Sequence, residues 1–106
     1  YTYIKNFLRK EKMKMKEIKK DKVFQYTGMY IPVEVKRPNF FINAFKRKVL
    51  YFVGNTFMIK NSFKYVDSFM RINEIIYVGD YIVEDEEGIV HMIRKKEFEN
   101  NYKIVE

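Results

Sequence analysis

Side chains able to do acid–base or nucleophilic chemistry are few in this sequence of 106 residues. It has one histidine, His91, and no cysteine, which excludes a paired-histidine mechanism, a thiolate metal site and a cysteine nucleophile. Ser62 and Ser68 lie outside the Gly-x-Ser-x-Gly context of a nucleophilic serine. Four glycines in the whole chain leave no glycine-rich phosphate loop. These residues favour a binding protein over an enzyme.

The densest group of carboxylates is the run from Glu84 to Glu87. It lacks the alternating ligand spacing of an EF-hand calcium loop, so we interpret it as a solvated hairpin turn. His91 follows in a β-branched and aliphatic run from Ile89 to Ile93, where an ordinary strand histidine is expected. The sequence therefore predicts no metal and no cofactor.

The net charge of +7 is unevenly distributed along the chain. Residues 1–22 carry +6, residues 23–64 carry another +6, and residues 65–106 carry −5. A basic half of this kind attracts phosphate backbones or an acidic protein face. The alternative is that the lysines are simply solvated surface.

Two basic clusters are the candidate binding sites for a partner or a nucleic acid. The first combines a lysine-rich start with the lysines that follow it, and the second surrounds a predicted helix. Their members are Lys10, Lys12, Lys14, Lys16, Lys19 and Lys20 in the first cluster, and Lys36, Arg37, Lys46, Arg47 and Lys48 in the second. Lys46 to Lys48 also suit the negative end of a helix dipole, which is a structural reason for them.

Aromatic residues make up 18% of the chain, and several tyrosines lie among the predicted strands beside basic residues. Aromatic and basic side chains on one sheet face can hold single-stranded nucleic acid by stacking and phosphate contact. Core packing and a protein interface are the alternative roles. The tyrosines concerned are Tyr26, Tyr30, Tyr51, Tyr65, Tyr77 and Tyr81.

The periodicity of apolar residues predicts a basic helix over 3–14. Strands are expected over 23–26 and 30–35, and a helix is expected to begin at Asn39, whose side chain can cap it. The pair Gly54-Asn55 predicts a hairpin that joins strands over 49–53 and 56–60.

In the second half, Asn61-Ser62 predicts a break before further strand-like pieces, which are 63–67, 69–72 and the extended or helical 74–78. A hairpin is expected from 81–83 and 89–93, followed by a helical turn over 95–100 and an edge strand over 102–105. The expected core comprises Phe24, Phe41, Phe45, Phe52, Ile82, Ile89, Phe98 and Tyr102.

The fold class that follows is α+β, a small and predominantly antiparallel β-sheet with one packed helix and a basic N-terminal helix. Residues 1–15 would form the helical extension and residues 16–106 a single domain.

No stretch approaches the ~20 apolar residues of a membrane span, and no secretory signal is recognised, so a cytoplasmic location is expected.

Two stretches resemble a family of small bacteriophage and prophage proteins. Val23 to Gly28 resembles that family's opening strand, which ends in Gln-aromatic-Thr-Gly. A second stretch resembles its closing run; it comprises Met70-Arg71, Val78 to Val83, Gly88, Lys96 to Glu99 and Tyr102. The matches cover about half of the chain, whereas 29–56 and the insertion 73–77 depart from the pattern.

The resemblance implies an accessory phage protein and carries over no active site. It also places the family's usual start near Met13 or Met15, which would make residues 1–12 an extension. We expect a non-enzymatic inhibitor of a bacterial defence system, anti-CRISPR-like, that binds a nucleic-acid-guided effector or its guide RNA in the host cytoplasm. The alternative is an RNA- or DNA-binding accessory module of phage replication. Neither function involves a membrane or a small-molecule ligand.

Overall fold

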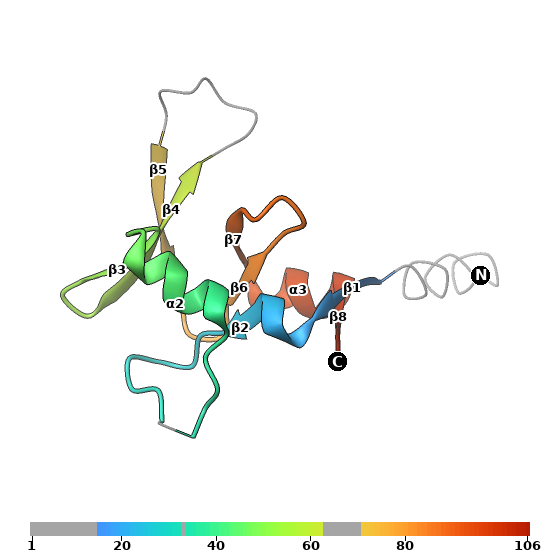
Figure 1. Cartoon of the computed structure of the whole chain (residues 1–106). Coiled ribbons are helices and arrows are strands. Elements are labelled where there is room, and N and C mark those ends of the chain that lie inside the picture. The colour runs from blue at the N-terminus through green and yellow to red at the C-terminus, as the bar shows by residue number, and fades with distance from the viewer. Residues whose placement is uncertain (1–14, 33, 63–70) are drawn as a thin grey trace, which may run out of the picture.

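A computed structural model describes residues 15–32, 34–62 and 71–106 (Figure 1). The basic helix predicted over 3–14 and the strand pieces predicted within 63–70 lie outside these residues. The described elements, in chain order, are β1 (Lys16–Lys19), the 3-10 helix η1 (Lys20–Lys22), β2 (Val23–Gln25), α2 (Asn39–Lys46), β3 (Leu50–Val53), β4 (Thr56–Ser62), β5 (Arg71–Ile76), β6 (Tyr81–Glu84), β7 (Val90–Ile93), α3 (Lys95–Asn101) and β8 (Tyr102–Val105).

The described strands form three small sheets rather than the one sheet predicted. Two of them are antiparallel, with strand orders β2-β6-β7 and β3-β4-β5. The third is the parallel pair β1-β8, in which Lys16 lies opposite Tyr102. The α+β class and the mostly antiparallel pairing are confirmed.

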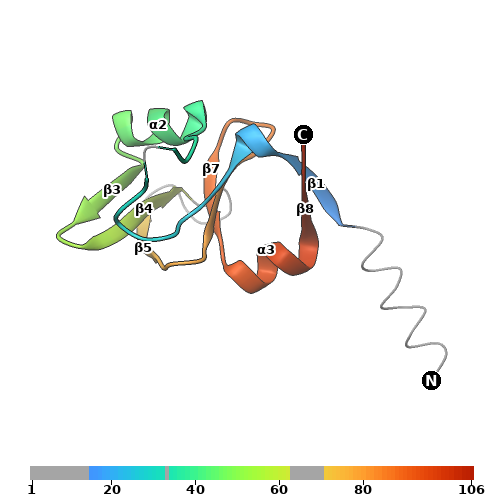
Figure 2. The same ribbon diagram turned by 90° about the horizontal axis from the view of Figure 1, so that it is seen from below.

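Strand β8 does not close the main sheet, as was expected of an edge strand. Figure 2 shows α3 running from the end of β7 to the start of β8, so the helix carries the chain away from the β2-β6-β7 sheet and to the side of β1. Parallel strands need such a long connection, and the two partners here are far apart in the sequence.

Helix α2 packs one apolar stripe against both antiparallel sheets. Phe40, Phe41 and Ala44 are buried at helical spacing. The ring of Phe41 stacks on Phe24 of β2 with centroids 4.2 Å apart, and it meets Phe57 of β4 edge-on at 6.4 Å. This aromatic cluster is therefore the joint between the two sheets.

The helix begins differently from the prediction. Pro38 occupies the N-cap position, and its carbonyl accepts hydrogen bonds from the N–H groups of Phe41 and Ile42. Asn39 is the first helical residue and makes no side-chain cap. The prediction that Asn39 caps the helix is wrong because Pro38 already has the extended backbone that a cap requires.

A second, smaller cluster closes the other end of the described chain. Phe98 of α3 is 2% exposed and lies between two tyrosines. Its ring centroid is 3.9 Å from that of Tyr81 and 5.0 Å from that of Tyr102. Val23 and Val83 complete the buried part of this cluster.

The expected core is confirmed at four positions, which are Phe24, Phe41, Ile82 and Phe98. Phe45, Ile89 and Tyr102 are only partly buried. Phe52 is 40% exposed, so its assignment to the core is wrong. Phe52 lies one residue before the end of β3, close to the hairpin turn, and it stays exposed although the rings of Phe57 and Phe45 stack on it at 4.7 and 6.1 Å.

Two predicted features of the strands are also wrong. The described residues of 30–35 form no strand. Arg37 donates to the carbonyl of Ile31, and Val35 N–H donates to the carbonyl of Pro32, so these backbone groups are satisfied locally. Asn61 and Ser62 do not interrupt the chain, since β4 continues through them and pairs with β5. The two hairpin turns at 54–55 and 85–88 are confirmed.

Candidate nucleic-acid interface

The first basic cluster is only partly described by the structure. Lys10, Lys12 and Lys14 lie outside the described residues. Lys16 and Lys19 are exposed on β1. Lys20 of η1 forms an ion pair with Glu106 at 2.8 Å, so an acid already accompanies its charge. This cluster therefore offers two described cations, Lys16 and Lys19, that form no ion pair with another described residue.

The second basic cluster is divided between the two ends of α2. Lys36 and Arg37 precede the helix, and Lys46, Arg47 and Lys48 end it. A helix of eight residues is about 12 Å long, so the two groups are separated by its length. The guanidinium of Arg37 donates to the carbonyl of Ile31 at 2.8 Å and holds the loop. The structure therefore does not bring the two groups together.

The three cations at the end of α2 form the strongest candidate surface, here called the α2 cluster (Lys46, Arg47 and Lys48). All three side chains are exposed, and none of the ion pairs between described residues involves them. They adjoin the negative end of the helix dipole, which favours cations. The cluster presents a concentrated positive charge to solvent.

Backbone geometry fixes the direction of the chain after α2. The N–H of Lys48 donates to the carbonyl of Phe45, and that of Val49 donates to the carbonyl of Ala44. These are the paired bonds of a Schellman motif, whose C′ residue adopts the left-handed conformation and is usually glycine. Here the C′ residue is Lys48, with φ of 61°. Lys48 therefore occupies a position where the backbone conformation favours glycine.

Lys48→Gly is expected to raise the free energy of unfolding by about 1 kcal/mol, because glycine adopts a positive φ without the steric penalty of a Cβ. Arg47→Gly is the matched control, since it also removes one cation but from a right-handed backbone. It should lower stability. Urea denaturation measures both. A less stable Lys48→Gly variant would contradict the assigned end of α2.

Lys60 extends the α2 cluster and was not among the predicted site residues. Its N–H donates to the carbonyl of Val49 at 2.9 Å, which places its backbone beside the residue that follows Lys48. Its ammonium lies over the ring of Tyr51, 5.9 Å from the centroid. The hairpin signal could have indicated this, because counting outward from Gly54-Asn55 pairs residue 49 with residue 60.

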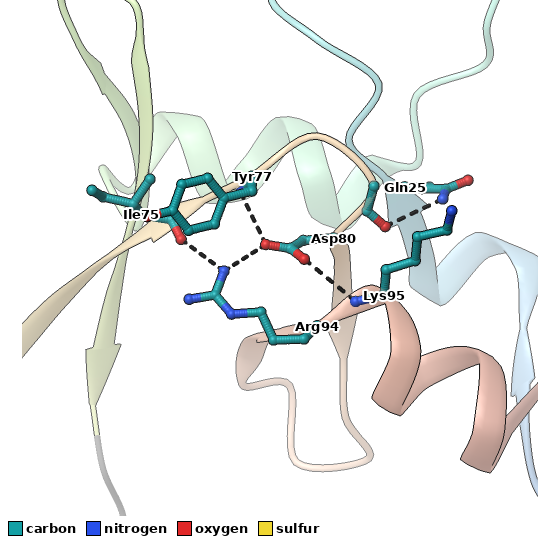
Figure 3. Close-up of polar contacts among 7 residues, drawn as sticks. Gln25, Ile75, Tyr77, Asp80, Arg94 and Lys95 are labelled. Atoms are coloured by element: carbon teal, nitrogen blue, oxygen red, sulfur yellow. Dashed lines mark hydrogen bonds and ion pairs between the residues drawn. The ribbon is translucent and has the colours of Figure 1, made fainter.

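The best-connected polar group is Asp80, which is 5% exposed (Figure 3). Its Oδ2 accepts from the N–H of Tyr77 at 2.9 Å and from Arg94 Nη1 at 2.5 Å, and its Oδ1 accepts from the N–H of Lys95 at 3.3 Å. These bonds close the turn before β6 and fix the start of α3. Asp80 therefore caps the turn that precedes β6.

The acidic run from Glu84 to Glu87 is a hairpin turn, as predicted. Asp85 Oδ1 accepts from the N–H groups of Glu87 and Ile89, each at 2.9 Å. His91 Nε2 donates to Asp85 Oδ2 at 2.7 Å, which accounts for the histidine. Within residues 15–32, 34–62 and 71–106, no group of three His, Cys, Asp or Glu side chains could hold a metal ion.

Acid is expected to weaken this turn. Burial raises the pKa of Asp85, but the hydrogen bonds from His91, Ile89 and Glu87 outweigh burial and hold the pKa below its ordinary value of 3.8. A carboxyl with a depressed pKa stabilises the fold above its unfolded pKa and loses that effect as pH falls through the folded pKa. The Tm difference between the wild type and Asp85→Asn should therefore shrink below about pH 4. A difference that does not vary with pH would contradict this.

Comparison of the chain with family models, curated proteins and solved structures found no match. The resemblance to small phage proteins therefore stays a prediction. None of the described helices is long and apolar enough to cross a membrane.

Proposed function

We propose that this protein is a non-enzymatic inhibitor of a bacterial nucleic-acid-guided defence system, and that it acts by binding the RNA of the effector complex. The observation that carries the proposal is the α2 cluster, three adjacent exposed cations that form no ion pair with described residues. The defence context comes from the resemblance to phage proteins. The mode of action comes from the charge.

Phosphates suit the α2 cluster better than an acidic protein face does. A nucleic-acid strand presents one negative charge for every nucleotide, and adjacent cations can neutralise successive phosphates. Lys48 adopts a left-handed conformation that favours glycine, so the chain carries a cation there at a cost in backbone energy. A positive φ at a residue other than glycine or asparagine is a reason to look for a function.

The test is to measure binding to three targets, which are an RNA-guided effector loaded with its guide RNA, the same effector without RNA, and the RNA alone. We expect equimolar binding to the loaded effector and much weaker binding to the effector without RNA. Equal binding to the loaded effector and to bare RNA would favour the accessory module of phage replication. Binding to none of the three would contradict the proposal.

A further inference from the structure

The two faces of the β3-β4-β5 sheet differ in burial. Helix α2 covers one face (Figure 2), and the described residues of the opposite face are half-buried or exposed. Strand alternation and register assign the residues of the opposite side, here called the outer face. Its members whose side chains the structure describes are Tyr51, Val53, Thr56, Met58, Lys60, Asn73 and Ile75.

The outer face carries positive charge and no acid. Among the outer-face residues whose side chains the structure describes, Lys60 is the charged one. Glu74 of β5 lies opposite the buried Ile59 and so belongs to the covered face. Lys60 is exposed and takes part in none of the ion pairs between described residues. Its N–H donates to the carbonyl of Val49, so its backbone lies beside the residue that follows the α2 cluster. The charge of this face is complementary to phosphate.

Tyr51 is the aromatic residue of the outer face. The ring is partly buried, and the ammonium of Lys60 lies 5.9 Å from its centroid. Met58 of β4 and Ile75 of β5 continue the same row across the sheet. The result is an aromatic ring beside a cation that forms no ion pair with another described residue, which is the combination that holds an unpaired base and its phosphate.

Tyr77 and Arg94 form a second pair of a tyrosine ring and a cation, but here the cation already has an ion-pair partner. Tyr77 is 58% exposed and Arg94 Cζ lies 5.1 Å from its ring centroid. Asp80, however, binds the guanidinium of Arg94, so this cation is already neutralised and held in place (Figure 3). Tyr77 therefore provides a matched control for Tyr51.

We infer that the outer face binds single-stranded RNA, with one base stacked on Tyr51 and the following phosphates bound by Lys60 and the α2 cluster. This inference rests on the proposed function and specifies which form of RNA is bound. The ammonium of Lys60 moves from the ring of Tyr51 to a phosphate when the base stacks. Duplex RNA binds less tightly, because its bases are paired and stacked inside the helix.

The test uses fluorescence anisotropy with a labelled single-stranded oligouridine and with an RNA duplex of equal length. Tyr51→Leu should weaken binding of the oligouridine about tenfold, because it removes one base–aromatic stack. Tyr51→Phe should bind like the wild type, since the ring remains. Tyr77→Leu should also bind like the wild type. The duplex should bind more weakly than the oligouridine.

A measurement on the wild type keeps the test independent of how well the variants fold. Oligouridine that contains 4-thiouridine should crosslink to the peptide that holds Tyr51.

Three results would overturn the inference. These are crosslinks confined to other peptides, binding of the duplex as tight as that of the oligouridine, and equal losses of affinity in Tyr51→Leu and Tyr77→Leu. If neutralising Lys46 and Arg47 abolishes binding while Tyr51→Leu does not, the inference fails and the proposed function stands. If the wild type binds no RNA, free or in the effector, both fail.

Discussion

Phe98→Ala is expected to lower the free energy of unfolding by about 3–5 kcal/mol, the range for a large aromatic side chain removed from a core. Phe98 is 2% exposed, and Tyr81 and Tyr102 stack on its two sides. Its removal takes away the ring on which both tyrosines stack. It also weakens the attachment of α3, on which the pairing of β8 with β1 depends.

Urea denaturation of the full chain measures this change. Val78→Ala is the matched control, because Val78 is exposed and its truncation should change stability by less than about 0.5 kcal/mol. A cost below about 1 kcal/mol for Phe98→Ala would mean that the second hydrophobic cluster does not hold α3 against the sheet.

Neutralising two members of the α2 cluster should have the largest effect on binding. Lys46→Gln together with Arg47→Gln is expected to weaken binding to single-stranded RNA about thirtyfold, at roughly 1 kcal/mol for each cation beside a phosphate. Glutamine is used because it is a good helix former and adds no anion to the end of the helix.

The control for this double variant is Lys96→Gln with Lys103→Gln, which removes the same charge from α3 and β8. Both residues are exposed, and neither takes part in an ion pair between described residues. If binding depends only on net charge, the two double variants should lose the same amount of affinity for single-stranded RNA. If the α2 cluster is the site, the control should bind nearly as well as the wild type.

Features of the fold that depend on neighbours in sequence could be predicted. The Gly54-Asn55 pair and the run ending in Gly88 mark two hairpins because each turn needs specific backbone conformations over a few residues. The periodic phenylalanines of α2 marked its buried face. Local chemistry was sufficient in these cases.

Features that depend on distant partners could not be predicted. The pairing of β1 with β8 joins the two ends of the described chain, and no local signal specifies a parallel partner so far away. Asn61 and Ser62 have the composition of a turn, yet pairing with β5 keeps them extended. Tertiary context overrides a weak local preference at such positions.

In the candidate site, too, some features could be predicted from local sequence and others depend on the folded chain. The run Lys46-Arg47-Lys48 was visible in the sequence, but the separation of Lys36 and Arg37 by the length of α2 was not. The left-handed backbone of Lys48 follows from the hydrogen bonds that end the helix, and these depend on how the chain turns into β3. The pairing of Lys60 with Tyr51 required only the hairpin register and could have been derived.

The salt dependence of binding to single-stranded RNA tests the central claim most directly. The dissociation constant should be measured from about 50 to 200 mM salt for the wild type and for Lys46→Gln with Arg47→Gln. The account predicts a linear log–log plot whose slope is smaller in the double variant by about 1.4, since each lost phosphate contact to a single strand removes about 0.7. Equal slopes and equal affinities for the two proteins would contradict it.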